Sequence, residues 1–265
     1  LNKNTGDFDM DILANEFDID QLVDWGFKHI DLDINIDKIV EGNTEDDHIP
    51  EVKESRVKLG DVWQLGKHRL MCGDSTKESD VEKLMNGDKA DMVFTDPPYG
   101  VDYNGGTGRY KNNKIKSKTQ NKIKNDINES IYNYLEKIIL FNLKEGAVYI
   151  WYADKFIKNV INSFNVLELR SVIIWYKINQ GFGDMGANYH NVAESCLYMI
   201  KGKSNFIGEN NEKNVWELQR PQKNKLHPTQ KPLELCIKAI KNHKAKIVLD
   251  LFLGSGSTLI ACEKT

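Results

Sequence analysis

From residue 90 onward, short apolar segments of strand length alternate with amphipathic segments of helical length. The apolar segments are 90–94, 147–152, 169–177, 192–199 and 246–252. The amphipathic segments are 129–143, 154–164, 232–243 and a last one that begins at 254–258. Alternation of this kind is typical of a mostly parallel sheet with helices on both faces. We therefore expect an α/β fold built on a doubly wound, mostly parallel sheet.

The sequence before this region predicts a smaller set of elements. The alternation and glycine turns of 57–66 indicate a hairpin, and 68–72 is expected to be a strand that ends in Gly73-Asp74. A helix should follow at 77–85, with Ser75 or Thr76 as its N-cap.

Charge divides the chain near residue 50. Residues 1–50 contain 14 acidic residues and 3 lysines, a net charge of −11, whereas the whole chain carries −3 and the remainder +8. A basic body suits a polyanionic partner, although a solvated acidic tail produces the same asymmetry without any partner. We expect an acidic N-terminal segment at 1–50 and one domain at 51–265.

Apolar segments and cysteines limit the class of protein further. No apolar segment approaches the roughly 18 residues of a bilayer-spanning helix, and the acidic N-terminus lacks the pattern of a signal peptide. The four cysteines form no Cys-x-x-Cys pair, and we expect buried free thiols rather than metal ligands. The sequence thus predicts a cytoplasmic protein without a membrane segment and without a metal.

A basic stretch interrupts the alternation at 101–128. Between 101 and 125, Arg109 and six lysines oppose a single acidic residue, Asp102. A mobile basic loop can hold the phosphates of a nucleic acid, and a solvated, disordered tract is an equally good interpretation. The candidate phosphate-binding residues are Arg109, Lys111, Lys114, Lys116 and Lys118.

The first group of residues suited to chemistry is Asp96-Pro97-Pro98-Tyr99, which follows the predicted strand 90–94. Open α/β sheets bind ligands at the carboxyl ends of their strands. Because prolines stiffen the chain and have no N–H to donate, the Asp96 carboxylate and a fixed carbonyl would form two acceptors for an NH2 group. Tyr99 would offer a stacking face, and the set suits the exocyclic amine of a planar base. A rigid turn with a capping aspartate is the alternative.

A second group ends the predicted strand 246–252, which contains Asp250 and Phe252 and leads into Gly254-Ser255-Gly256. The turn opens a helix, where free N–H groups favour a carboxylate or phosphate. It is not a dinucleotide fingerprint, because Leu259 occupies the third glycine position, and an ordinary Gly-rich turn is the alternative.

A third group is His227-Pro228-Thr229-Gln230-Lys231-Pro232, with Thr229 placed to cap the helix at 232–243. Taken alone, it indicates no more than a solvated helix start.

Together the three groups resemble the DNA amino-methyltransferases that use S-adenosylmethionine. Their order matches the permuted class of that family, in which Asp-Pro-Pro-Tyr precedes the Gly-rich turn, and Gly73-Asp74 matches as well. The resemblance spans about residues 58–265 and implies a Rossmann-like methyltransferase fold. Residues 1–50 resemble, much more weakly, the tail of a ParB-like partition domain, which occurs fused to phage-type methyltransferases.

The resemblance implies that Asp96, Pro97, Pro98 and Tyr99 are the catalytic residues. In the family, the aspartate and the first proline's carbonyl accept hydrogen bonds from the target amine, and the tyrosine stacks on the base. These hydrogen bonds draw the nitrogen lone pair out of ring conjugation and direct it at the sulfonium methyl group. The base of a duplex must be flipped out to reach them.

The resemblance also implies a pocket for S-adenosylmethionine, with the Gly-rich turn near the methionine part of the cofactor. The expected cofactor-binding residues are Asp74, on the adenine side, and Thr229, Lys231, Asp250, Phe252, Gly254 and Gly256. No metal and no general base are required, because the sulfonium is already activated and the amine can lose its proton after transfer.

The chain departs from the family at its ends. It begins at Leu1 and stops at Thr265, before the strand that carries the family's ribose-binding acidic residue. We therefore expect a piece truncated at both ends, with one strand of the sheet lacking and a reduced affinity for the cofactor.

The leading hypothesis is an adenine-N6 methyltransferase that acts on double-stranded DNA in a bacterial or phage-infected cell, as part of restriction-modification. In the family, Asp at the first position of the tetrapeptide favours adenine and Ser favours cytosine. The alternatives are cytosine-N4 methylation, methylation of RNA or a protein amide, and a DNA-binding or partition protein with a degenerate methyltransferase body. The oligomeric state stays open, a homodimer included.

Overall fold

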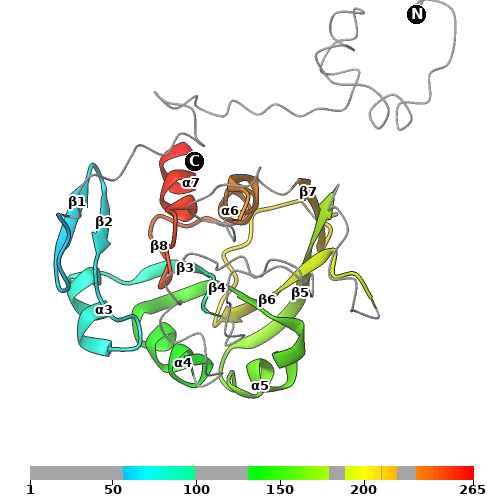
Figure 1. The fold of residues 1–265 in the computed structure, drawn as a ribbon, viewed down its shortest axis with the longest axis horizontal. Helices are drawn as coiled ribbons and strands as arrows, with labels where there is room; N and C mark the ends of the chain where they lie inside the picture. The colour runs from blue at the N-terminus through cyan, green and yellow to red at the C-terminus, as the bar shows by residue number, and fades with distance from the viewer. Residues whose placement is uncertain (1–55, 99–130, 179–188, 210, 220–230) are drawn as a thin grey trace, which may run out of the picture. The chain divides into compact units, whose positions relative to one another are not determined.

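A six-stranded sheet forms the centre of the structure, with the strand order β7-β5-β6-β4-β3-β8 (Figure 1). Its strands are β3 (Ala90–Thr95), β4 (Leu143–Tyr152), β5 (Glu168–Ile178), β6 (Ala193–Lys201), β7 (Val215–Gln219) and β8 (Val248–Leu249). The computed structural model describes residues 56–98, 131–178, 189–209, 211–219 and 231–265. The acidic segment at 1–50, its boundary with the domain and the basic loop at 101–128 lie outside the described residues.

One strand of this sheet runs against the others. β6 pairs antiparallel with β4 and β5, whereas the β3–β4, β3–β8 and β5–β7 pairs are parallel. The predicted mostly parallel sheet is therefore confirmed. Because β3, β4 and β8 are parallel neighbours, the residues that follow β3 and β8 lie at the same edge of the sheet.

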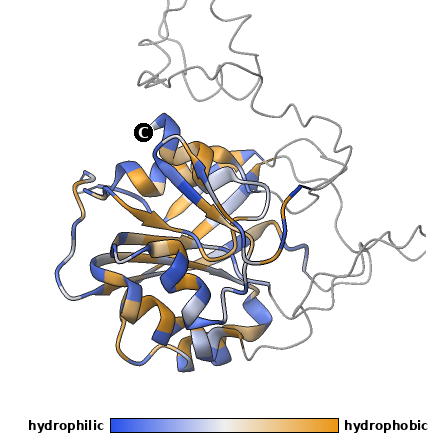
Figure 2. Ribbon diagram, turned by 90° about the vertical axis from the view of Figure 1, so that its left-hand side faces the viewer, coloured by the Kyte–Doolittle hydropathy of each residue, from blue (hydrophilic) through white to orange (hydrophobic). Residues whose placement is uncertain are grey.

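Helices cover both faces of the sheet, with α4 and α5 on one side and α6 and α7 on the other (Figure 1). The helices are α3 (Glu78–Met85), α4 (Ile131–Asn142), α5 (Ile157–Asn162), α6 (Leu233–Lys241) and α7 (Ser257–Lys264), and a 3-10 turn (Asp154–Phe156) precedes α5. Successive side chains of a strand point to opposite faces. Val93 therefore packs in the core beneath α3 and α4, whereas Met92 and Phe94 pack in the core beneath α6 and α7. In Figure 2, the hydrophobic colouring is concentrated in the strands and on parts of the helices.

The N-terminal hairpin differs from its prediction. β1 (Val62–Leu65) and β2 (His68–Met71) form a separate two-stranded antiparallel sheet, so the strand expected at 68–72 is the second arm of the hairpin. The turn contains Gly66 at a φ of +57°, a conformation that glycine adopts without a steric penalty.

The predicted N-cap of α3 is wrong. Lys77 occupies that position and makes no side-chain cap bond. The hydroxyl of Thr76 instead donates a hydrogen bond to the carboxylate of Asp74 at 2.6 Å. This bond lies within the turn before the helix, so the Thr76 hydroxyl does not cap α3.

Two strands also differ from the sequence prediction. β8 contains only Val248 and Leu249 of the apolar segment 246–252, because only these two residues pair in register with β3. β7 is not predicted from the sequence, since it is a short strand whose side chains are mostly exposed, with only Trp216 buried.

None of the described helices combines the length and apolar character needed to cross a bilayer. Within the same residues, no group of three or more His, Cys, Asp or Glu side chains is placed to hold a metal ion. All four thiols are free; Cys196 and Cys236 are buried as predicted, whereas Cys72 and Cys262 are partly exposed.

Candidate active site

Asp96 directly follows β3, at the edge of the sheet where the carboxyl ends of parallel strands meet. Its side chain is 32% exposed, while Thr95 before it and Pro97 after it are buried. The fixed φ of the two prolines keeps this segment stiff. Tyr99, the fourth predicted catalytic residue, lies outside the described residues.

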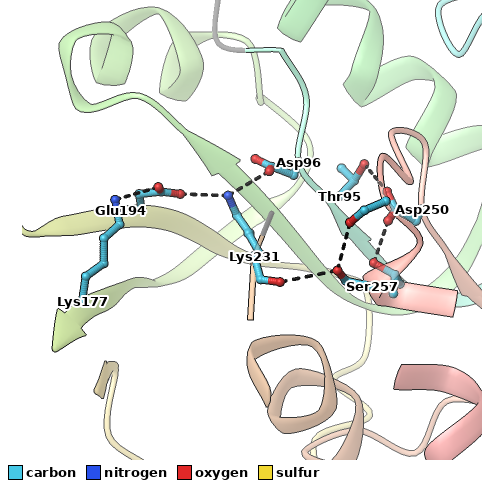
Figure 3. Close-up of polar contacts among 9 residues, drawn as sticks. Thr95, Asp96, Lys177, Glu194, Lys231, Asp250 and Ser257 are labelled. Carbon is cyan, nitrogen blue, oxygen red and sulfur yellow. Dashed lines mark hydrogen bonds and ion pairs between the residues drawn. The ribbon is translucent and has the colours of Figure 1, made fainter. Parts of the chain in front are cut away.

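A buried ammonium group holds one oxygen of Asp96. Lys231 Nζ lies 2.8 Å from Asp96 Oδ2 and 2.9 Å from Glu194 Oε2. The other oxygen of Glu194 lies 2.8 Å from Lys177 Nζ. These four side chains form a row of alternating charge (Figure 3), named here the charged row. Lys231 Nζ also lies 4.7 Å from the centre of the Trp151 ring on β4.

The members at the centre of the charged row are ionised at neutral pH. Burial by itself would raise the pKa of Glu194, but the ammonium groups of Lys231 and Lys177 outweigh it and lower that pKa to about 2. Burial would lower the pKa of Lys231, but the carboxylates of Asp96 and Glu194 outweigh it and raise that pKa above its ordinary value. Opposite charges a hydrogen bond apart favour the charged form of both partners.

A second carboxylate, that of Asp250, joins β3 to the Gly-rich turn (Figure 3). Asp250 Oδ1 accepts hydrogen bonds from the Thr95 hydroxyl and the Phe252 N–H, both at 3.0 Å. Asp250 Oδ2 accepts one from the Thr258 hydroxyl at 2.6 Å. Burial raises the pKa of Asp250 to about 6, even though these three donors lower it. Both oxygens are thus engaged in holding the segment between β8 and α7.

The Gly-rich turn has the backbone that glycine alone adopts easily. Gly254 and Gly256 have φ values of +57° and +94°. Gly256 is the N-cap of α7 and provides no side-chain cap, and a Cβ built on it would meet no atom within 4 Å. The hydroxyl of Ser257 lies 3.4 Å from the carbonyl oxygen of Lys231, so the turn and the charged row adjoin.

A cavity of about 750 Å³ lies beside β8. The residues that line it include Asp74, Asp80, Asp250, Leu251 and Thr258. Small-molecule sites commonly have volumes of about 300–1,000 Å³. Of the predicted cofactor-binding residues, Asp74 and Asp250 therefore border one space large enough for a nucleoside-sized ligand.

The structure brings several predicted residues together and leaves others undescribed. Asp96, Lys231, Asp250 and the Gly-rich turn form one connected set, and Asp74 faces the cavity beside it. Lys231 is buried, so the interpretation of its segment as a solvated helix start is wrong for this residue. The predicted residues outside the described ranges are Tyr99, Arg109, Lys111, Lys114, Lys116, Lys118 and Thr229.

Sequence reasoning missed Glu194, Lys177 and Thr95. Each lies on a strand that was predicted, or directly at its end, and the first two are charged residues within apolar segments. A charged residue is seldom buried in a strand unless it is paired. Glu194 and Lys177 on neighbouring predicted strands could therefore have suggested an ion pair, but their link to Asp96 has no local signal.

Solved structures of methyltransferases have the same fold. The chain matches the crystal structure of the M1.HpyAVI-SAM complex with a TM-score of 0.52 and 25% identity, over 70% of this chain and 84% of that chain. It matches the PvuII DNA methyltransferase (cytosine-N4-specific) with a TM-score of 0.51 and 15% identity, over 73% and 77% of the two chains. The fold and site thus define a methyltransferase.

Sequence comparison narrows this class to one family. The profile of the DNA methylase family matches residues 90–265. The Type II methyltransferase M2.MboI of Moraxella bovis is 29% identical over 64% of this chain and 71% of its own length. The Type II methyltransferase M.HpaI of Haemophilus parainfluenzae is 26% identical over 74% of this chain and 66% of its own length. The chain belongs to the DNA methylase family.

The described residues fit S-adenosylmethionine, the methyl donor of this family. The space beside Gly256 is open, and the N-terminus of α7 carries no side-chain cap, so a ligand carboxylate can approach the free N–H groups there. The adjoining cavity contains Asp74, whose carboxylate is anchored by the Thr76 hydroxyl. The Gly-rich turn and the cavity thus offer places for the two ends of the cofactor.

Proposed function

We propose that the chain transfers a methyl group from S-adenosylmethionine to the N6 amine of an adenine flipped out of double-stranded DNA. The observation that carries the proposal is the position of Asp96. Its carboxylate stands at the end of β3, is held by Lys231 at 2.8 Å and adjoins the Gly-rich turn through Thr95 and Asp250. An acceptor for the target amine therefore lies beside the residues suited to the cofactor.

The proposed chemistry needs few groups from the protein. Asp96 and the carbonyl of Pro97 accept hydrogen bonds from the target amine, which directs the nitrogen lone pair out of the plane of the base. When bound, S-adenosylmethionine supplies a methyl group on a positively charged sulfur. The new nitrogen–carbon bond forms as the carbon–sulfur bond breaks, and the nitrogen then releases a proton to solvent. Tyr99 stacks on the flipped base.

The cofactor is held in this proposal by the predicted set of residues. The turn with Gly254 and Gly256 receives the methionine part, and Asp74 contacts the adenine side. Asp250 and Phe252 position the turn, as the Phe252 N–H bond to Asp250 at 3.0 Å supports. Thr229 and Lys231 complete the pocket.

Adenine is the proposed base because Asp96 stands at the first position of the tetrapeptide, where the resembling enzymes that methylate cytosine carry Ser. Flipping a base out of a duplex costs stacking and pairing energy, which contacts to the phosphates must offset. We assign these contacts to Arg109, Lys111, Lys114, Lys116 and Lys118. Such an enzyme would act on DNA in the cytoplasm of a bacterial or phage-infected cell. The relatives named Type II methyltransferases support the proposal that it functions in restriction-modification.

Nucleoside mass spectrometry tests the proposal. The protein is incubated with S-adenosylmethionine and unmethylated duplex DNA, and the digested DNA is examined for methylated bases. N6-methyladenine is the expected product. N4-methylcytosine would overturn the choice of base while leaving the mechanism. A protein that neither binds the cofactor in calorimetry nor marks DNA would instead be a DNA-binding protein with a degenerate methyltransferase body.

A further inference from the structure

Lys231 is the link between Asp96 and a carboxylate that the proposed chemistry does not use. Its side chain is 7% exposed and lies between Asp96 and Glu194, at 2.8 and 2.9 Å. A buried ammonium is costly unless its hydrogen-bond donors are satisfied by acceptors. Glu194 therefore helps to determine whether Lys231 stays in this position.

The backbone of Glu194 is held in place by the pairing of β6 with β5. It lies near the start of β6, where Glu194 and the next three residues pair with Val172–Trp175 of β5. One oxygen of Glu194 contacts Lys177 of β5 and the other contacts Lys231. Both oxygens are thus directed by neighbours on separate elements, and the carboxylate cannot turn without losing its contact with Lys177 or Lys231.

Lys231, by contrast, has a long and flexible side chain. Its backbone precedes α6, and its carbonyl oxygen lies 3.4 Å from the Ser257 hydroxyl. This contact places the backbone but not the ammonium group, which lies at the end of a four-carbon stem. The contacts that place the ammonium are those with Asp96, Glu194 and the face of Trp151.

We propose that Glu194 is a positioning residue for methyl transfer: it holds Lys231 against Asp96, so that the Asp96 carboxylate keeps one orientation toward the target amine. Lys177 neutralises Glu194 and fixes its second oxygen. This inference rests on the proposed role of Asp96 and adds Glu194 and Lys177 to the residues on which the reaction depends. Neither of them touches the target base; they act through Lys231.

Steady-state kinetics of the Glu194→Gln variant test the inference. The amide keeps the shape of the side chain but removes the charge that attracts Lys231. Misplacing a catalytic group by about an ångström can cost on the order of a hundredfold in rate, so we expect kcat to fall by about ten- to a hundredfold. The KM for DNA and the Kd for S-adenosylmethionine should change by less than about threefold, because Glu194 touches neither ligand and the part of Lys231 that adjoins the Gly-rich turn is its backbone, at the Ser257 hydroxyl. An unchanged kcat would overturn the inference.

A double-mutant cycle distinguishes positioning from a general structural role. If Glu194 acts through Lys231, then adding Glu194→Gln to a Lys231→Met protein causes no further loss of kcat. Losses that multiply would show that Glu194 acts by another route and would overturn the inference. The matched control is Glu212→Gln, which breaks the 3.1 Å ion pair with Lys238 elsewhere in the fold and should keep the kcat of the parent.

A second variant covers the case in which Glu194→Gln fails to fold because Lys177 is left unpaired. The Glu194→Gln, Lys177→Met protein removes one positive and one negative charge together, so no lone charge is left buried by the change. Its kcat should stay as low as that of a folded Glu194→Gln protein, because Lys231 still lacks its second carboxylate. Recovery of the parent's kcat would show that charge balance, not positioning, matters.

A crystal structure of the variant separates this inference from the proposed function. Without Glu194's charge, Lys231 Nζ should move away from position 194, and the Asp96 carboxylate, which still attracts it, should turn from its present orientation, whatever substrate the protein uses. An unmoved Lys231 would overturn the positioning role. A displaced Lys231 in a protein whose parent form methylates no DNA would instead support positioning and refute the proposed function.

Discussion

The hydroxyl of Thr95 donates a hydrogen bond to Asp250 at 3.0 Å, although the two residues are 155 positions apart in the sequence. The same hydroxyl accepts a hydrogen bond from the Leu251 N–H at 3.2 Å. Thr95 is the last residue of β3 and is followed by Asp96, and Asp250 follows β8 before the Gly-rich turn. The hydrogen bonds therefore set the distance between the proposed acceptor of the target amine and the turn proposed to hold the cofactor.

Replacing Thr95 with Val should destabilise the fold. Val has the shape of Thr but provides neither the donor to Asp250 nor the acceptor for the Leu251 N–H. Leaving buried polar groups unsatisfied costs about 1–3 kcal/mol, and we expect the free energy of unfolding in urea to fall by about that amount. Thr95→Ser keeps the hydroxyl and should lose less. A Thr95→Val protein that is as stable as the parent, beside a less stable Thr95→Ser protein, would mean that the methyl group and not the hydrogen bonds stabilises this site.

The ionisation of Asp250 should contribute to the pH dependence of the free energy of unfolding. Its pKa is raised from 3.8 in the ordinary case to about 6, mainly because burial disfavours the charged form. Between about pH 4 and pH 6 the folded protein therefore binds more protons at this site than the unfolded chain. The site's contribution to stability is present below that range and is lost as the pH rises through it.

The Asp250→Asn variant isolates this contribution. Its amide can accept from Thr95 and the Phe252 N–H through its oxygen and donate to the Thr258 hydroxyl through its nitrogen, so the network can persist. Urea unfolding of both proteins from pH 4 to pH 7 should show a free energy that falls less steeply in the variant. Parallel pH profiles for the two proteins would contradict the raised pKa.

Replacing Asp96 with Ala should abolish methyl transfer and leave cofactor binding largely intact. The change removes an acceptor for the target amine, whereas the Gly-rich turn and the cavity beside β8 are untouched. Methyl transfer would be followed by nucleoside mass spectrometry and S-adenosylmethionine binding by calorimetry. An equal loss of transfer and binding would indicate that Asp96 maintains the structure, through its contact with Lys231, rather than the chemistry.

Replacing Lys114, Lys116 and Lys118 with Ala should weaken DNA binding and flatten its dependence on salt. Each phosphate contact contributes about 0.9 to the slope of log affinity against log salt concentration, so the slope should fall by up to about 3. The measurement is DNA binding by fluorescence anisotropy at several salt concentrations.

A triple-alanine protein at Lys144, Lys203 and Lys244 is the matched control. These exposed lysines lie at the start of β4, after β6 and before β8, at the edge of the sheet opposite Asp96. The control should keep the parent's slope. An unchanged slope in the first variant would show that its lysines do not contact the phosphates.

Much of the fold follows from local periodicity. The alternation from residue 90 predicts β3, β4, β5 and β6 and the helices between and after them to within a few residues. Prediction failed where an element depends on its neighbours. Only two residues of 246–252 form β8, because the ladder with β3 extends no further, and β7 forms because β5 offers it an edge.

The residues of the candidate site likewise fall into those that the local sequence indicates and those that it does not. Asp96, Asp250, Gly254 and Gly256 are visible in the sequence because their neighbours have local consequences: prolines stiffen the chain, and glycines permit left-handed backbone. Glu194 and Lys177 stand in ordinary strand segments. Nothing near them in the chain indicates that Glu194 contacts Lys231 as well as Lys177.

The sequence by itself determined the order of the strands and helices other than β7, the chemical groups at the ends of β3 and β8, and the family to which they belong. Only the tertiary structure decided that Lys231, which reads as a solvated residue before a helix, is buried between two carboxylates. The physical reason is that local conformation depends on nearby residues, whereas burial and the pairing of charge depend on which distant segments pack together. The ionisation of Glu194 and the raised pKa of Asp250 are therefore properties of the folded chain.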